Sequence, residues 1–149
     1  MPFNAQAMSE VAKWQQYRPP TPHYGETVYC VTPHYDTSGR TTVALINAEG
    51  DRGIACRYSV GSLPCLTLWK NTDTMEEGYV TGIEPGTGFP FRRALEREAG
   101  RVPKLASGAS VAFHLEWQLL SSAAAVKATR DEISSIQMGR PTTVDSRSQ

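Results

Sequence analysis

Short runs of alternating apolar and polar residues, separated by turn residues, recur through the middle of the chain. They are rich in β-branched and aromatic side chains, which favour extended backbone. We predict strands at 26–32, 41–47, 53–60, 63–70, 79–83 and 110–120. Strands at intervals of about ten residues with turn signals between them are typical of an antiparallel β-sandwich. The turn residues at 36–39 further predict that 41–47 pairs with 26–32 as a hairpin.

The longest alternating run predicts the last strand, 110–120. Its apolar face is Val111, Phe113, Leu115, Trp117 and Leu119, and its polar face is Ala112, His114, Glu116 and Gln118. A period of two predicts a half-buried antiparallel strand. His114 and Glu116 could line a groove on the polar face, but an ordinary polar strand face is the alternative, so they are assigned no function.

The two ends of the chain have a different character. An apolar face that includes Met8, Val11 and Ala12 predicts a short helix within 5–17. Alanine-rich sequence without proline or glycine predicts another at 121–137, capped by Ser122 and stopped by Gly139 and Pro141. We therefore divide the chain into an entry segment and linker (1–22), a β-sandwich (23–120), a helix (121–138) and a disordered tail (139–149). The fold class is all-β with a C-terminal helix.

Composition and hydropathy argue against several classes of function. The formal net charge is zero, with 15 basic and 15 acidic residues, so we expect no nucleic-acid partner. No apolar run approaches the roughly 20 residues of a membrane helix, and no signal peptide is evident. Three cysteines in strand-like runs, without metal-ligand spacing, predict buried free thiols, no metal and a cytoplasmic location.

Glu84 is the main candidate for chemistry. The apolar run 79–83 delivers its carboxylate at the predicted end of a strand, where Pro85 stops the ladder and Gly86 and Gly88 begin an open loop. Proline also keeps the preceding residue extended. A carboxylate at the edge of a sheet suits a general base, and a glutamate pointing into water is the alternative.

The stretch 63–120 resembles the galactose mutarotase-like, or aldose 1-epimerase, superfamily, in the branch labelled DUF4432. The segments that carry the resemblance are LPCLTLWK (63–70), YVTGIEPGT (79–87), EAGRVPKL (98–105) and GASVAFHLEW (108–117). The resemblance implies part of a supersandwich fold, and it implies that Glu84 is the catalytic base of a cofactor-free reaction that interconverts sugar anomers. It covers only what corresponds to the C-terminal part of such proteins. The upstream segment that carries the family's acid histidine has no counterpart, and neither His23 nor His34 stands in a matching context.

Three further residues are candidates for substrate binding. Trp69 could stack on a pyranose, with core packing as the alternative; Thr87 lies on the loop after Glu84, and Arg93 could donate to sugar hydroxyls. Lys70 could do the same, although basic residues at strand ends usually stay solvated. Two alternatives to the epimerase remain open: a non-catalytic carbohydrate-binding module, and a truncated, inactive fragment. Besides the sugar, we expect a homo-oligomer or a missing N-terminal half as partner, joined through exposed strand edges.

Overall fold

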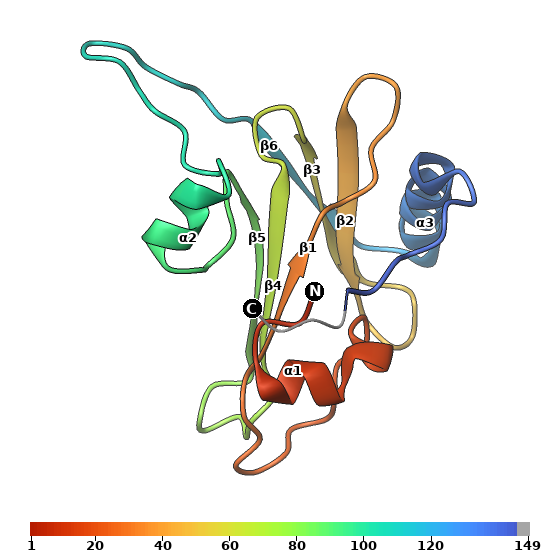
Figure 1. The fold of residues 1–149 in the computed structure, drawn as a ribbon. Helices are drawn as coiled ribbons and strands as arrows, with labels where there is room; N and C mark the ends of the chain where they lie inside the picture. The colour runs from red at the N-terminus through yellow and green to blue at the C-terminus, as the bar shows by residue number, and fades with distance from the viewer. Residues whose placement is uncertain (146–149) are drawn as a thin grey trace. The chain divides into compact units, whose positions relative to one another are not determined.

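The structure, a computed structural model, describes residues 1–145. These residues form two compact units (Figure 1). The first unit is Met1–Thr32 and Cys65–Val102, together with the segment from Thr142 on; the second is Pro33–Pro64 and Pro103–Pro141. Each unit contains one antiparallel sheet of three strands, and the second ends in a helix. The predicted fold class, mostly β with a C-terminal helix, is confirmed.

The sheet of the first unit has the order β1-β4-β5. Its strands are β1 (Thr27–Val31), β4 (Cys65–Asn71) and β5 (Val80–Gly86). The first residues of the chain lie along the other edge of β1, where the Phe3 amide donates to the Val28 carbonyl at 2.9 Å and the Cys30 amide donates to the Met1 carbonyl at 2.8 Å. Therefore β4 is central and β5 is an edge strand.

The helix predicted within 5–17 is shorter than expected. The α1 helix (Ala5–Ser9) is capped by Asn4, whose side chain accepts a 2.8 Å hydrogen bond from the Ala7 amide, and a 3₁₀ turn (Val11–Lys13) follows. In a longer helix, the backbone carbonyls of Trp14 and Gln16 would accept hydrogen bonds from the helix itself. Here they accept hydrogen bonds from Lys70.

Lys70 is buried, with 4 % of its surface exposed, so a solvated role at the strand end is wrong. Its Nζ donates to the carbonyls of Trp14 at 2.6 Å and Gln16 at 2.9 Å. The same ammonium lies 4.9 Å and 5.0 Å from the ring centroids of Tyr17 and Tyr29, within cation–π range. Burial lowers the pKa of this amine. Lys70 thus ties the entry segment to β4.

The second unit contains the sheet β2-β3-β6, formed by β2 (Arg40–Ile46), β3 (Gly53–Ser59) and β6 (Leu115–Leu120). The predicted hairpin between 26–32 and 41–47 is wrong, because β1 pairs with β4 and β2 pairs with β3. The turn after β2 explains the choice. The Asn47 side chain accepts hydrogen bonds from the amides of Asp51 and Arg52, which fixes a tight β2–β3 connection.

Helix α3 (Ala123–Gln137) packs on one face of this sheet (Figure 1). Ser122 caps it as predicted, accepting a hydrogen bond from the Ala125 amide at 3.2 Å. The apolar contact is a cluster of Ala55, Leu120 and Val126. Beside it, Arg57 on β3 binds both carboxylate oxygens of Glu132 on α3, at 2.8 Å and 2.7 Å. This bidentate ion pair fixes the helix to the sheet.

The last strand differs from its prediction in two ways. It begins at Leu115 instead of residue 110, and the apolar side chains that alternation assigned to a half-buried face are all exposed. The predicted helix at 121–137 matches α3. The tail predicted to be disordered, 139–149, extends beyond the described residues.

Candidate functional site

Glu84 lies within β5, two residues before its end. The strand continues through Pro85, opposite Leu66, to Gly86. The expectation that Pro85 stops the ladder is therefore wrong. Because β5 is an edge strand, the amide that proline lacks can face away from β4, and no ladder hydrogen bond is lost.

The Glu84 carboxylate folds back along its own strand. Gly82, two residues earlier, points to the same face, and a Cβ placed on it would lie 2.2 Å from Glu84 Oε1. The absence of a side chain at position 82 thus makes room for this rotamer. Within residues 1–145, the Glu84 carboxylate forms neither a hydrogen bond nor an ion pair, and the residue is exposed. The carboxylate is open to a ligand.

Trp69 lies on the same face as Glu84. On β4 it stands opposite Gly82, while Thr67 stands opposite Glu84, so Trp69 and Glu84 are diagonal cross-strand neighbours. Such neighbours are about 7 Å apart, within reach of an aromatic side chain. Gly82, opposite the indole, carries no side chain of its own, and the Glu84 carboxylate occupies the space above it. Alternation along the sequence predicted that Trp69 lies on the opposite face of the strand from Leu66 and Leu68. The β4–β5 register confirms this.

A second carboxylate joins this face. The indole Nε1 of Trp69, a partly exposed residue, donates a 2.6 Å hydrogen bond to Glu26 Oε2, just before β1. Sequence reasoning missed Glu26, because its place beside Trp69 depends on the β1–β4 pairing, in which Val28 stands opposite Trp69. We call Glu26, Trp69 and Glu84 the acidic–indole face.

The other two predicted binding residues are less closely placed. Thr87 directly follows β5 and is partly buried, while Arg93 is the first residue of α2 (Arg93–Glu98) and is exposed. No described contact joins either one to Glu84.

The loop after Glu84 is tied down, contrary to the open loop that we predicted. Glu96 on α2 is 4 % exposed, and its Oε2 accepts hydrogen bonds from the Phe89 amide at 3.0 Å and from Arg101 Nε at 2.8 Å. Its Oε1 accepts from Arg101 Nη2 at 2.6 Å. This hydrogen-bonded guanidinium lowers the pKa of the Glu96 carboxyl. A Cβ on Gly88 would lie 2.7 Å from the Glu96 carboxylate, so glycine is needed there.

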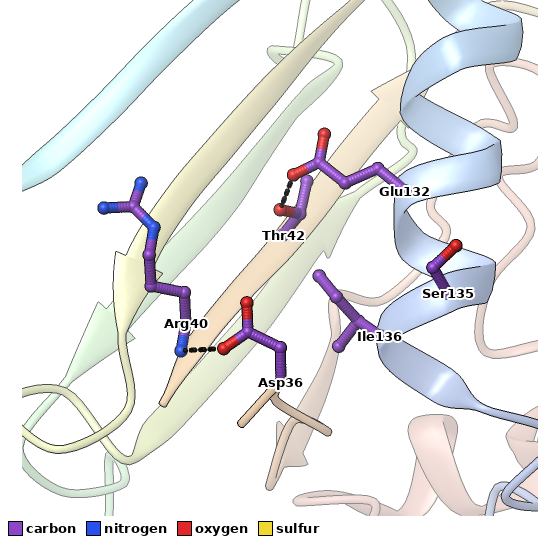
Figure 2. Close-up of a pocket in the computed structure, with 6 residues that line it drawn as sticks. All are labelled: Asp36, Arg40, Thr42, Glu132, Ser135 and Ile136. Carbon is purple, nitrogen blue, oxygen red and sulfur yellow. Dashed lines mark hydrogen bonds between the residues drawn. The ribbon is translucent and has the colours of Figure 1, made fainter. Parts of the chain in front are cut away.

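Two cavities in the second unit lie elsewhere. One, of about 410 Å³, is lined by Asp36, Arg40, Thr42, Glu132, Ser135 and Ile136 (Figure 2). The other, of about 230 Å³, includes His114 and Glu116, but also Arg40 and Arg57, which pair with Glu116. The Glu132 carboxylate in the first cavity is already bound to Arg57 and Thr42. Neither cavity includes a residue of the acidic–indole face.

The described residues contain no cluster of three or more histidine, cysteine or acidic side chains that could hold a metal ion. In the same part of the chain, no helix is long and apolar enough to cross a membrane. His23 lies in a turn before β1, and its amide donates to Asp73. His34 and His114 belong to the second unit.

Comparison with known proteins places the chain in a family. The model of DUF4432, a domain of unknown function, matches residues 1–119. The fold also matches the crystal structure of a candidate aldose 1-epimerase from Klebsiella pneumoniae subsp. pneumoniae MGH 78578, with a TM-score of 0.90 and 42 % sequence identity. That match covers 94 % of this chain and 36 % of the other. No curated protein matches the sequence.

The chain is thus an aldose 1-epimerase-like β protein, as the resemblance implied. It belongs to the DUF4432 family. It spans about a third of the length of the Klebsiella protein that it matches.

Proposed function

We propose that the chain binds a sugar on the acidic–indole face and interconverts its anomers, with Glu84 as general base. One observation carries the proposal: the unpaired Glu84 carboxylate and the Trp69 indole share one sheet face as diagonal neighbours. The similarity to a candidate aldose 1-epimerase supports the class of reaction.

The proposed chemistry needs one base and one acid. Glu84 takes the proton from the anomeric hydroxyl while an acid protonates the ring oxygen, so the bond between the anomeric carbon and that oxygen breaks. Rotation about the neighbouring carbon–carbon bond and the reverse proton transfers close the ring with the other configuration. General acid–base catalysis of this kind typically contributes about 100- to 10,000-fold. The reaction requires no metal or organic cofactor.

The apolar C–H face of a pyranose would lie on the Trp69 indole, beside the Glu84 carboxylate that folds back over Gly82. Glu26 would hold that ring, since it accepts the indole N–H. We include Thr87 and Arg93 as substrate contacts, because one follows β5 directly and the other begins the helix after the same loop. Three buried free thiols support a reducing compartment, and we propose the cytoplasm.

A second function, carbohydrate binding without catalysis, is favoured by a different observation. The Glu84 carboxylate has no hydrogen-bonded partner within residues 1–145, so no acid is held against it in the described chain. The match to 36 % of the Klebsiella protein allows for an acid carried elsewhere in longer relatives, which would leave this chain inactive by itself.

The test is NMR magnetisation exchange between α and β anomers, with a panel of aldoses and the purified protein. We expect exchange above the buffer rate, lost in Glu84→Gln while sugar affinity changes little. Glu77→Gln, an exposed carboxylate in the β4–β5 connection, is the matched control. Exchange that persists in Glu84→Gln would remove Glu84 as the base. Sugar binding with no exchange in the original chain would establish the non-catalytic function.

A further inference from the structure

A strip of large apolar side chains is exposed along β6 and the segment before it. The exposed fractions are 42 % for Leu115, 50 % for Trp117 and 80 % for Leu119. Val111 and Phe113 continue the same alternation and are 60 % and 43 % exposed. Contiguous apolar patches of this kind on a protein surface mark sites of interaction. We call these five residues the β6 strip.

The same face of the sheet is closely packed one strand away. Trp117 stands opposite Cys56 on β3, and Leu115 stands opposite Tyr58. Cys56 and Tyr58 are each 1 % exposed and belong to a core cluster with Leu63. The layer that covers this face over β3 therefore does not extend over β6.

The edge of β6 is open as well. Within the described residues, β6 pairs with β3 alone, so it forms one edge of its sheet. Residues 103–119 are all exposed, and 103–114 form a projecting loop without helix or strand that turns back on itself before β6 (Figure 1). An apolar strip beside an open strand edge is suited to accept both a covering layer and an additional strand.

The comparison with the Klebsiella protein indicates what fits there. That chain contains this fold at a TM-score of 0.90, yet the matched part is 36 % of its length. Nearly all of the present chain, 94 %, is inside the match, so the fold occurs in a protein that carries much more polypeptide. A second copy of this chain pairing β6 with β6 would extend the sheet sideways and leave the strip uncovered from above.

We propose that the β6 strip docks further β-structure of the same family, equivalent to the part of the Klebsiella protein outside the matched region. The docked segment places apolar side chains over Trp117 and Leu119 and adds a strand along the open edge of β6. This surface is distinct from the acidic–indole face.

A chimera tests the proposal: the present chain replaces the matched part of the Klebsiella protein. In the isolated chain 1–149, Leu119→Lys should leave the melting temperature nearly unchanged, since the side chain is 80 % exposed. In the chimera it should lower the melting temperature by several degrees. Met75→Lys, at a 68 % exposed methionine in the β4–β5 connection, is the control and should have little effect in either protein.

Hydrogen exchange gives a second readout that does not depend on a substitution. The amides of 115–119 should exchange at least tenfold more slowly in the chimera than in the isolated chain. Equal exchange in both proteins, or a Leu119→Lys effect of the same size in both, would overturn the proposal. So would a chimera that fails to fold while the isolated chain folds. A self-associated isolated chain that Leu119→Lys dissociates would make a second copy the occupant and also overturn it.

Discussion

Trp69 and Glu26 are joined across the sheet by a 2.6 Å hydrogen bond from the indole Nε1 to the carboxylate Oε2. Glu26, just before β1, and Trp69, on β4, are 43 positions apart in sequence, and both lie on the face that carries Glu84. A charge-assisted hydrogen bond of this kind limits rotation of the indole ring. A ring held in one orientation loses less entropy when a sugar stacks on it.

Substitutions at both residues should therefore weaken sugar binding, and the substitution at Trp69 should weaken it more. Trp69→Ala deletes the stacking surface, and we expect the affinity to fall by more than tenfold. Glu26→Gln keeps an acceptor for the indole N–H but loses its charge, and we expect a fall of roughly threefold, since neutral hydrogen bonds are about half as strong. Calorimetric titration of each variant measures both. Unchanged affinity in Trp69→Ala would remove Trp69 from the binding site.

The Gly82→Ala variant tests whether the position of the Glu84 carboxylate matters, because it moves that carboxylate without removing it. An added Cβ would lie 2.2 Å from Oε1, so the carboxylate must rotate away, which is easy for the end of a flexible side chain. We expect a normal fold by circular dichroism and anomer exchange reduced at least tenfold, because small displacements of a catalytic group are costly. Glycine at 61, in the β3–β4 turn, is the matched position, and Gly61→Ala should retain exchange. Full exchange in Gly82→Ala would show that this carboxylate rotamer is not the reactive one.

Local patterns predicted the elements better than their partners. Alternation located five strands to within a few residues, and Ser122 located the start of α3, because these signals depend on near neighbours. Pairing is a long-range property. Turn residues lie on both sides of β2, at 36–39 and at 47–52, so the local pattern did not decide which turn closes the hairpin. The partner of β1 is β4, about 40 positions away, and such a distant pairing leaves no local pattern.

The same distinction applies to the site. Residue type and parity made Glu84 and Trp69 candidates, and the structure places them on one face, whereas Glu26 was missed because its position beside Trp69 depends on the β1–β4 pairing. The burial of Glu96 could not be predicted from the sequence. It stands in a run of interleaved arginines and glutamates, and such a run is typical of a solvated surface. Only the fold brings it under the Phe89 loop, where Arg101 neutralises it.

Glu96 should make the first unit sensitive to acid. The folded-state pKa is below the unfolded value of about 4.3, so its stabilisation is complete above that pH and is lost as the pH falls through the folded pKa. Glu96→Gln cannot bind Arg101 as an ion pair and leaves a buried amide poorly matched to a partly exposed guanidinium. We expect a loss of about 2–3 kcal/mol at pH 7. Urea unfolding measured from pH 7 to pH 3 should show the difference between the two proteins shrinking on acidification. A constant difference would contradict this linkage.

The three cysteines should be inert in the folded protein. Cys30, Cys56 and Cys65 are 3 %, 1 % and 4 % exposed, and none forms a disulfide within residues 1–145. Burial raises the pKa of all three thiols, that of Cys30 to about 11. Because the thiolate is the nucleophile, iodoacetamide at pH 8 should modify the folded protein at least a hundredfold more slowly than the urea-unfolded protein. Mass spectrometry should then detect three alkylated sites only after unfolding. Rapid alkylation of Cys30 in the folded state would mean that the pairing of Met1–Phe3 along β1 opens readily, since that segment lies on the Cys30 edge.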